Sequence, residues 1–173
     1  MPMPTIDEIK ERLKRYPGLR MEMEKMEARL EVLKSEETIP PLRPGDGSKR
    51  TAGTGDRQER AILRRMEYEE RYAPTIAANR QEIKAIDRAV AALSDPLERE
   101  VITIHYIEVD TYKPLPWRDV AIAMYGEDTD AKLLAVHRLH SKALQSLQKI
   151  LQEEGEIGYF AKILWTMIRN SND

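Results

Sequence analysis

Residues 93–108 read LSDPLEREVITIHYIE, residues 117–126 read WRDVAIAMYG, and residues 135–150 read AVHRLHSKALQSLQKI. The first two blocks have the length of short helices, and Gly126 follows the second where a left-handed turn is favoured. The third block is a longer helix with basic side chains. Two short helices, a turn and a longer basic helix are the order that a helix-turn-helix domain needs. We therefore predict an all-α protein in which residues 94–150 form such a domain.

The first helix of this domain has a clear start. Ser94 or Asp95 is a predicted N-cap, and Pro96 follows in the first turn, where a missing N–H removes no hydrogen bond. Helical spacing then predicts a buried face made of Leu97, Val101, Ile102, Ile104 and Tyr106. The solvated side of the same helix is predicted to carry Glu98, Arg99 and Glu100.

Prolines mark the start of the middle helix. Because Pro114 and Pro116 prevent a continuous helix, residues 110–116 are predicted to be a loop and residues 117–125 the next helix. Trp117 is predicted to anchor the start of that helix beneath the proline loop. The apolar residues that recur at helical spacing behind it are Val120, Ala121 and Met124.

The third helix separates apolar from polar side chains, and Thr129 or Asp130 is its predicted N-cap. The inner stripe consists of Leu133, Val136, Leu139, Ala143, Leu144 and Leu147. The outer side carries Lys132, His137, Arg138, His140, Ser141, Lys142, Gln145 and Lys149. Positive side chains are concentrated here, although the whole chain has a formal net charge of −2. A local excess of this kind favours contact with phosphates.

The LSDPLEREVI block, with WRDVA and VHRLHSKAL downstream, resembles region 4 of sigma-70-type factors. The upstream run DRQERAILRR, followed by a long helix that leads into the LSDP block, is similar to phage regulators of the RinA and ArpU type. This resemblance covers residues 56–150. It implies a sigma region 4-like helix-turn-helix, double-stranded DNA and RNA polymerase as partners, and regulation of transcription. In one departure, more residues than usual separate Gly126 from Val136, and they lengthen either the loop or the recognition helix.

Candidate DNA contacts follow from helix-turn-helix docking, in which the start of the second helix reads bases and the first helix crosses the backbone. Lys132 and His137 are the candidates for base contacts. The candidates for phosphate contacts are Arg118, Arg138, Lys142 and Lys149, with Ser141 and Gln145 on the flanks of the same face.

Residues 5–35 are predicted to form an N-terminal helical arm. Thr5 and Glu8 make a capping box at its start, and Pro17 with Gly18 is predicted to interrupt the helix. Beyond this interruption, the heptad spacing of a coiled coil is followed by Leu19, Met23, Met26, Leu30 and Leu33.

Residues 36–55 are rich in Pro, Gly and polar residues, which predicts a flexible linker. Residues 56–93 are predicted to be a long second helix with an apolar stripe that includes Met66. Pro74 predicts a kink or a break in this helix. Two amphipathic helices bury their stripes only against partners, so we expect an antiparallel hairpin within one chain, across a homo-oligomer, or both. The hairpin should therefore resemble a coiled coil.

Residues 151–173 are predicted to form a C-terminal apolar helix that packs back on the helix-turn-helix domain or at a contact between two copies. No apolar run is long enough to cross a membrane, and the first residues lack the pattern of a signal peptide. We therefore expect a protein of the bacterial host's cytoplasm that has no membrane partner.

Composition and motifs argue against a catalytic or metal-binding role for this chain. It has no Cys, which excludes disulfides, thiolate zinc sites and cysteine nucleophiles. His137 and His140 lie three residues apart, but no third ligand follows at a metal-binding spacing, so no metal or other cofactor is predicted. Because no serine triad order, phosphate-binding glycine loop or zincin motif occurs, we predict no enzyme.

Three functions are consistent with this sequence. The first is a sequence-specific, double-stranded DNA-binding transcription regulator of phage or prophage type, which reads the major groove with the helix around residues 130–149. The second is a DNA-packaging subunit similar to small terminases, and the third is a helical scaffold or assembly protein that does not bind DNA. A dimer with one operator would support the regulator, and a ring of many subunits would support the packaging subunit. A lack of salt-sensitive DNA binding would leave the scaffold.

Overall fold

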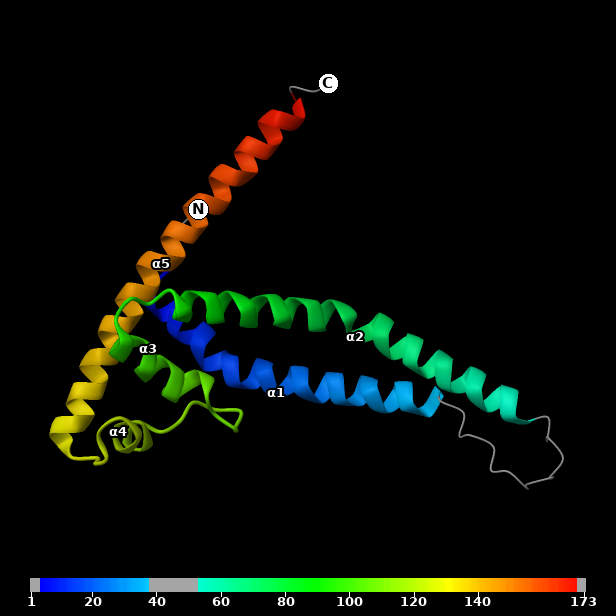
Figure 1. The fold of residues 1–173 in the computed structure, drawn as a ribbon, viewed down its shortest axis with the longest axis horizontal. Helices are drawn as coiled ribbons and strands as arrows, with labels where there is room; N and C mark the ends of the chain where they lie inside the picture. The colour runs from blue at the N-terminus through cyan, green and yellow to red at the C-terminus, as the bar shows by residue number, and fades with distance from the viewer. Residues whose placement is uncertain (1–3, 38–52, 171–173) are drawn as a thin grey trace. The chain divides into compact units, whose positions relative to one another are not determined.

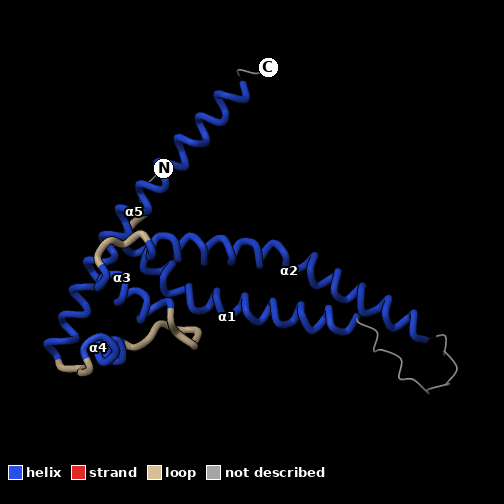
Figure 2. Tube along the Cα trace, viewed as in Figure 1, coloured by secondary structure: helices blue, strands red, loops and turns tan. Residues whose placement is uncertain are grey.

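The structure is a computed structural model that describes residues 4–37 and 53–170, with side chains described for residues 4–37 and 58–153. All regular elements in these ranges are helical (Figure 2), as predicted for an all-α protein. In chain order they are α1 (Ile6–Glu37), α2 (Gly53–Ala91), α3 (Pro96–Ile102), the π-helix η1 (Thr103–Ile107), α4 (Trp117–Tyr125) and α5 (Asp130–Asn170), as drawn in Figure 1. The predicted linker at residues 36–55 falls mostly outside the described residues.

The chain divides into two compact units. One comprises Leu19–Glu82, and the other comprises Met1–Gly18 together with Ile83–Asp173. Each of the two long helices α1 and α2 therefore contributes residues to both units.

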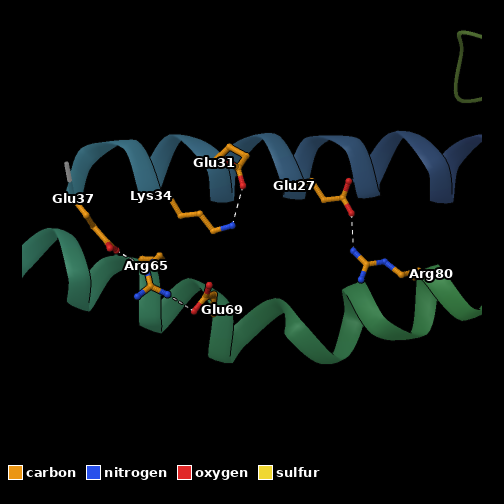
Figure 3. A network of polar contacts seen from close by, with 7 residues as sticks. All are labelled: Glu27, Glu31, Lys34, Glu37, Arg65, Glu69 and Arg80. Atoms are coloured by element: carbon orange, nitrogen blue, oxygen red, sulfur yellow. Dashed lines mark hydrogen bonds and ion pairs between the residues drawn. The ribbon is translucent and has the colours of Figure 1, made fainter.

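The Leu19–Glu82 unit is an antiparallel helical hairpin within one chain. Glu27 near the middle of α1 accepts a hydrogen bond from Arg80 at 2.8 Å, and Glu37 at the end of α1 is paired with Arg65. Residue numbers thus rise along α1 as they fall along α2. Arg65 also donates to Glu69 of its own helix at 2.6 Å, as Figure 3 shows. The predicted hairpin is confirmed for a single chain.

The packing of this hairpin corrects part of the predicted stripe. The side chains that it buries are Leu19, Met23, Leu33 and Ala61. Met66, predicted to be apolar core, is 54% exposed, and Leu63 beside it is 50% exposed. The small Ala61 takes the inner position instead, at 2% exposed.

Pro17 was expected to interrupt α1, and Pro74 was expected to kink or break α2; neither proline ends its helix. α1 continues through Pro17 and Gly18, so the predicted interruption is wrong. Pro17 is fully buried, and its fixed φ is close to the helical value, so packing compensates for the single lost hydrogen bond. α2 likewise continues past Pro74, which is exposed, so no break occurs there.

The second unit has one apolar core to which every one of its helices contributes. From α1 and α2 come Ile9, Leu13, Tyr16, Ile86, Ala89 and Val90, and from the rest of the unit come Leu93, Val101, Ile102, Tyr106, Val120, Ala121, Val136, Ala143, Leu144 and Leu147. The Tyr16 hydroxyl donates to Asp87 at 2.7 Å, which links the first turns of α1 to the end of α2. The Gln148 amide donates to the Pro4 carbonyl at 2.8 Å. The N-terminal segment is thereby held against the helix-turn-helix region.

The start of α3 is as predicted, with Asp95 as N-cap accepting a hydrogen bond from the Leu97 N–H at 2.9 Å and Pro96 in the first turn. The predicted faces need one correction. Glu98 is 3% exposed instead of solvated, and Leu97 is 50% exposed instead of buried. Viewed down the helix axis, Glu98 points between the buried Val101 and Ile102. Leu97 points to one side of this buried face.

α3 passes directly into the π-helix η1. The Glu108 N–H donates to the Thr103 carbonyl at 2.9 Å, five residues back. The wider turn lets the neighbours His105 and Tyr106 both point inward, with exposed fractions of 6% and 1%. The loop that follows and α4 have the predicted positions.

Gly126 closes α4 in the left-handed conformation predicted for it, with φ 77° and its N–H donating to Ile122 at 2.8 Å. Only residues 127–129 separate it from α5, which begins at Asp130. The Leu133 N–H donates to the Thr129 carbonyl at 2.9 Å, so Thr129 is the residue at the helix boundary. The residues from Asp130 to Val136 are therefore part of the helix and not of the loop.

α5 is a single helix of 41 residues. The predicted boundary between a domain ending at residue 150 and a separate C-terminal helix does not exist in the backbone. Gly155 is accommodated inside the helix, at the modest cost of an interior glycine. The packing predicted for the side chains of residues 151–173 lies almost wholly outside the described side chains.

Candidate nucleic-acid interface

α4, Gly126 and the first half of α5 form a two-helix arrangement in which α5 packs on α3 and α4 packs on η1. Ala121 of α4 is fully buried, and its small side chain permits the close approach that was expected of it. On the facing side, α5 buries Val136 and Ala143. The order short helix, tight turn and long helix is that of a helix-turn-helix.

The outer face of α5 presents three polar side chains opposite this buried stripe. Arg138, Gln145 and Lys149 are all exposed and are separated by seven and four residues, a spacing that places them on one helix face. Within the described part of the chain, Arg138 and Lys149 have no carboxylate partner. Their charges are therefore available to an external anion.

Two further predicted cations lie near the acidic turn that joins α4 to α5. Arg118 is 3.9 Å from Asp128, and Lys132 is 3.8 Å from Glu127, while its ammonium also lies 4.9 Å from the Tyr125 ring centre. These pairs are long and exposed, so they contribute little stability and leave both cations able to exchange partners.

Lys142 has closer carboxylate partners, although its own side chain is 62% exposed. Its ammonium lies 2.9 Å from Glu98 and 2.9 Å from Asp95, and the Glu98 side chain is only 4% exposed. The bond to Glu98, followed by the bond to Asp95, raises the pKa of Lys142. The same contact with Lys142, helped by the Leu97 N–H, lowers the pKa of Asp95. Lys142 neutralises a buried carboxylate and fastens α5 to the start of α3.

A cluster of aromatic and imidazole rings lies on one flank of α5. Trp117 stacks on His105 with ring centres 3.7 Å apart, and it lies 4.7 Å from His140 and 4.8 Å from His137. Trp117 thus packs at the start of α4 as predicted. The His105 ring Nδ1 is 2.6 Å from the Leu115 carbonyl, which ties the proline loop to η1.

His140 was expected on the outer side of the helix and is instead 5% exposed. It lies one turn beyond Val136 on the buried stripe, where its ring nitrogen Nε2 is 3.1 Å from the Tyr106 hydroxyl. Burial lowers the pKa of both His105 and His140 to about 4. Both rings are therefore uncharged near neutral pH. The alternating pattern of polar and apolar residues could not separate His140 from the exposed polar residues around it.

The rings form the floor of a groove of about 460 Å³. Its walls are Lys10 and Lys14 of α1 on one side and His137 and Ser141 of α5 on the other. The Ser141 hydroxyl donates to the His137 carbonyl at 2.9 Å. Two of the predicted DNA contacts thus lie beside this groove, away from the centre of the outer face.

The site residues predicted from the sequence therefore fall into three groups. Arg138, Gln145 and Lys149 share the outer face of α5. Arg118 and Lys132 lie near the acidic turn. Lys142 is paired with Asp95 and Glu98, and His137 and Ser141 line the groove beside the ring cluster. Sequence analysis missed Lys10 and Lys14 of α1, because no local pattern in the first turns of that helix marked them as neighbours of α5.

Among the described side chains, no three His, Asp or Glu residues come together as a metal ion would require. Over the same part of the chain, no helix has the length and apolarity needed to cross a membrane. Comparisons with family models, with curated proteins and with solved structures find no match to this chain.

Proposed function

We propose that this protein is a sequence-specific, double-stranded DNA-binding transcription regulator of phage or prophage type. The observation that carries the proposal is the outer face of α5. There Arg138 and Lys149 extend from the second helix of a helix-turn-helix arrangement without carboxylate partners among the described residues. The resemblance to sigma region 4 and to RinA- and ArpU-type regulators supports the same function.

The roles of the side chains follow from their surroundings. Arg138 and Lys149 are proposed to contact phosphates, with Gln145 between them near the groove edge. Arg118 and Lys132 would join the interface by exchanging weak carboxylate partners for phosphates. The carboxylates of Glu127, Asp128 and Asp130 repel phosphates, so we place the main contact along the middle of α5 and not at its first turn.

The Leu19–Glu82 hairpin supports a homo-oligomer as part of this proposal. Among its described side chains, the large apolar ones that are exposed are Val32, Leu63 and Met66, with exposed fractions of 47%, 50% and 54%. Such side chains on a hairpin with few buried residues are typical of a surface that meets another chain. A symmetric dimer would present two recognition helices to two half-sites.

The test begins with selection of bound duplexes from a random pool, followed by titration of the best duplex at several salt concentrations. Each phosphate contact contributes about 0.9 to the slope of log affinity against log salt. Combining Arg138→Ala with Lys149→Ala should therefore reduce the slope by about two. Lys84→Ala is a matched control, because Lys84 is an exposed helix lysine on α2.

Slopes and affinities that are identical for wild type and double variant would remove α5 from a DNA interface. Solution mass, measured alongside, separates a dimer from a ring of many subunits of the packaging type. A lack of any salt-sensitive duplex binding would favour the scaffold function.

A further inference from the structure

We propose that the groove between the start of α1 and the flank of α5 is a binding site for a small anionic molecule with a flat apolar part, of the mononucleotide class. It lies within one compact unit and does not depend on the outer face of α5. Its volume of about 460 Å³ is within the range of small-molecule sites.

The two walls of the groove present matching polar groups. Lys10 and Lys14 are one turn apart on α1, and His137 and Ser141 are one turn apart on α5. An anion held between the walls can receive bonds from both ammonium groups and from the imidazole. None of the nine residues that line the groove is Asp or Glu. Lys14 is paired with Glu11 at 2.6 Å, so the ammonium group of Lys10 is the more available of the two for an anion.

The floor of the groove favours a flat apolar part over a second charge. Its accessible apolar surface comes from Trp117 and Pro114, which are half-buried, while Tyr106 and the two imidazoles that also line it are buried. Because burial leaves His105 and His140 uncharged near neutral pH, the groove offers the ammonium groups of Lys10 and Lys14 on α1 as its lysine charges. A molecule with a ring at one end and a phosphate at the other matches this separation of apolar floor and cationic rim.

Occupation of this site would have a consequence for the helix-turn-helix. The ligand would touch α1, the start of α4 and the flank of α5 together, and a ligand that binds only this arrangement stabilises it. The stability of this arrangement of α5 would thus depend on the concentration of a small molecule.

The chain offers a direct readout. It contains three histidines, and all three line the groove, so their ring signals in a proton NMR spectrum report on this site alone. Adenosine monophosphate is the probe, and adenosine and inorganic phosphate are the two partial probes. We expect saturable shifts of the His137 signal with adenosine monophosphate at millimolar concentration. Each partial probe should bind at least about tenfold more weakly, since it lacks one half of the contacts.

The variant Lys10→Gln combined with Lys14→Gln should weaken binding of adenosine monophosphate by about tenfold or more. Lys34→Gln is the matched control, because Lys34 has the same exposed ion pair three residues from a glutamate, Glu31, at 2.9 Å. A thermal midpoint that stays unchanged in both variants shows that they are folded. Absence of saturable shifts, equal binding by adenosine or phosphate alone, or equal loss in the control would overturn the proposal. None of these outcomes bears on DNA binding, which has its own assay.

Discussion

Mild acid should destabilise the helix-turn-helix unit, because it contains two buried uncharged histidines. The pKa of His105 and of His140 is lowered from 6.5 to about 4, first by burial. In the unfolded chain both rings bind protons below about pH 6.5, whereas in the folded chain they do so only near pH 4. The unfolded state thus binds more protons between these values, and stability falls as pH falls through this window.

The size of the effect follows from the same pKa values. A pKa lowered from 6.5 to about 4 corresponds to roughly 3 kcal/mol for each ring once the pH is below both values. Both rings line an open groove, and solvent there reduces the difference. We expect a loss of about 2 kcal/mol per ring, or about 4 kcal/mol for the pair, between pH 7 and pH 4.5.

Urea unfolding of a Trp165→Phe variant, followed by the fluorescence of Trp117, measures this loss. His140→Gln should remove about half of the pH dependence. Asp95 does not interfere, because its lowered pKa gives a contribution that is lost only below its ordinary value of 3.8. Equal stability at pH 7 and pH 4.5, or an unchanged pH dependence in His140→Gln, would refute the assignment of two uncharged rings.

Three substitutions test the packing around the same cluster. Tyr106→Phe removes only the hydroxyl that meets His140 and should cost about 1–3 kcal/mol by urea unfolding, whereas no cost would mean that this bond is absent in solution. Trp117→Ala should cost about 3 kcal/mol, the low end for aromatic truncation since Trp117 is partly exposed, and an unchanged thermal midpoint would contradict its structural role. Gly126→Ala should cost about 1–2 kcal/mol in thermal unfolding because of its φ of 77°, and a neutral result would argue against the left-handed turn.

The local signals of the sequence predicted the boundaries around the helix-turn-helix well. Asp95, Pro96 and Gly126 act through their own backbone and nearest neighbours, so their effects can be read without knowing the rest of the fold. Helical periodicity predicted burial less reliably where a side chain has a partner far away in the sequence. Glu98 is buried because Lys142 reaches it from 44 residues further along the chain, and no local pattern contains that pairing.

The candidate site shows the same division. The exposed face with Arg138, Gln145 and Lys149 was readable from periodicity, because solvent exposure repeats with the helix. The ion pairs of Lys142 and the burial of His140 could not be predicted from periodicity, since each depends on contacts with α3 or η1. The interruption predicted at Pro17 was wrong for a related reason, because tertiary packing outweighed the local loss of one hydrogen bond.

The π-helix at residues 103–107 gives this domain one residue more than an α-helical path through the same space would contain. A deletion within this segment would let α3 continue as an ordinary α-helix and would rotate everything beyond it by one residue. His105 and Tyr106 could then no longer both face inward, and the imidazole that supports Trp117 would turn toward solvent. A shortened variant can therefore keep its helix content and its helix-turn-helix backbone while losing the ring cluster beneath them. In a lineage of related chains, the length of this segment would mark which members carry the cluster, even where the surrounding residues have diverged.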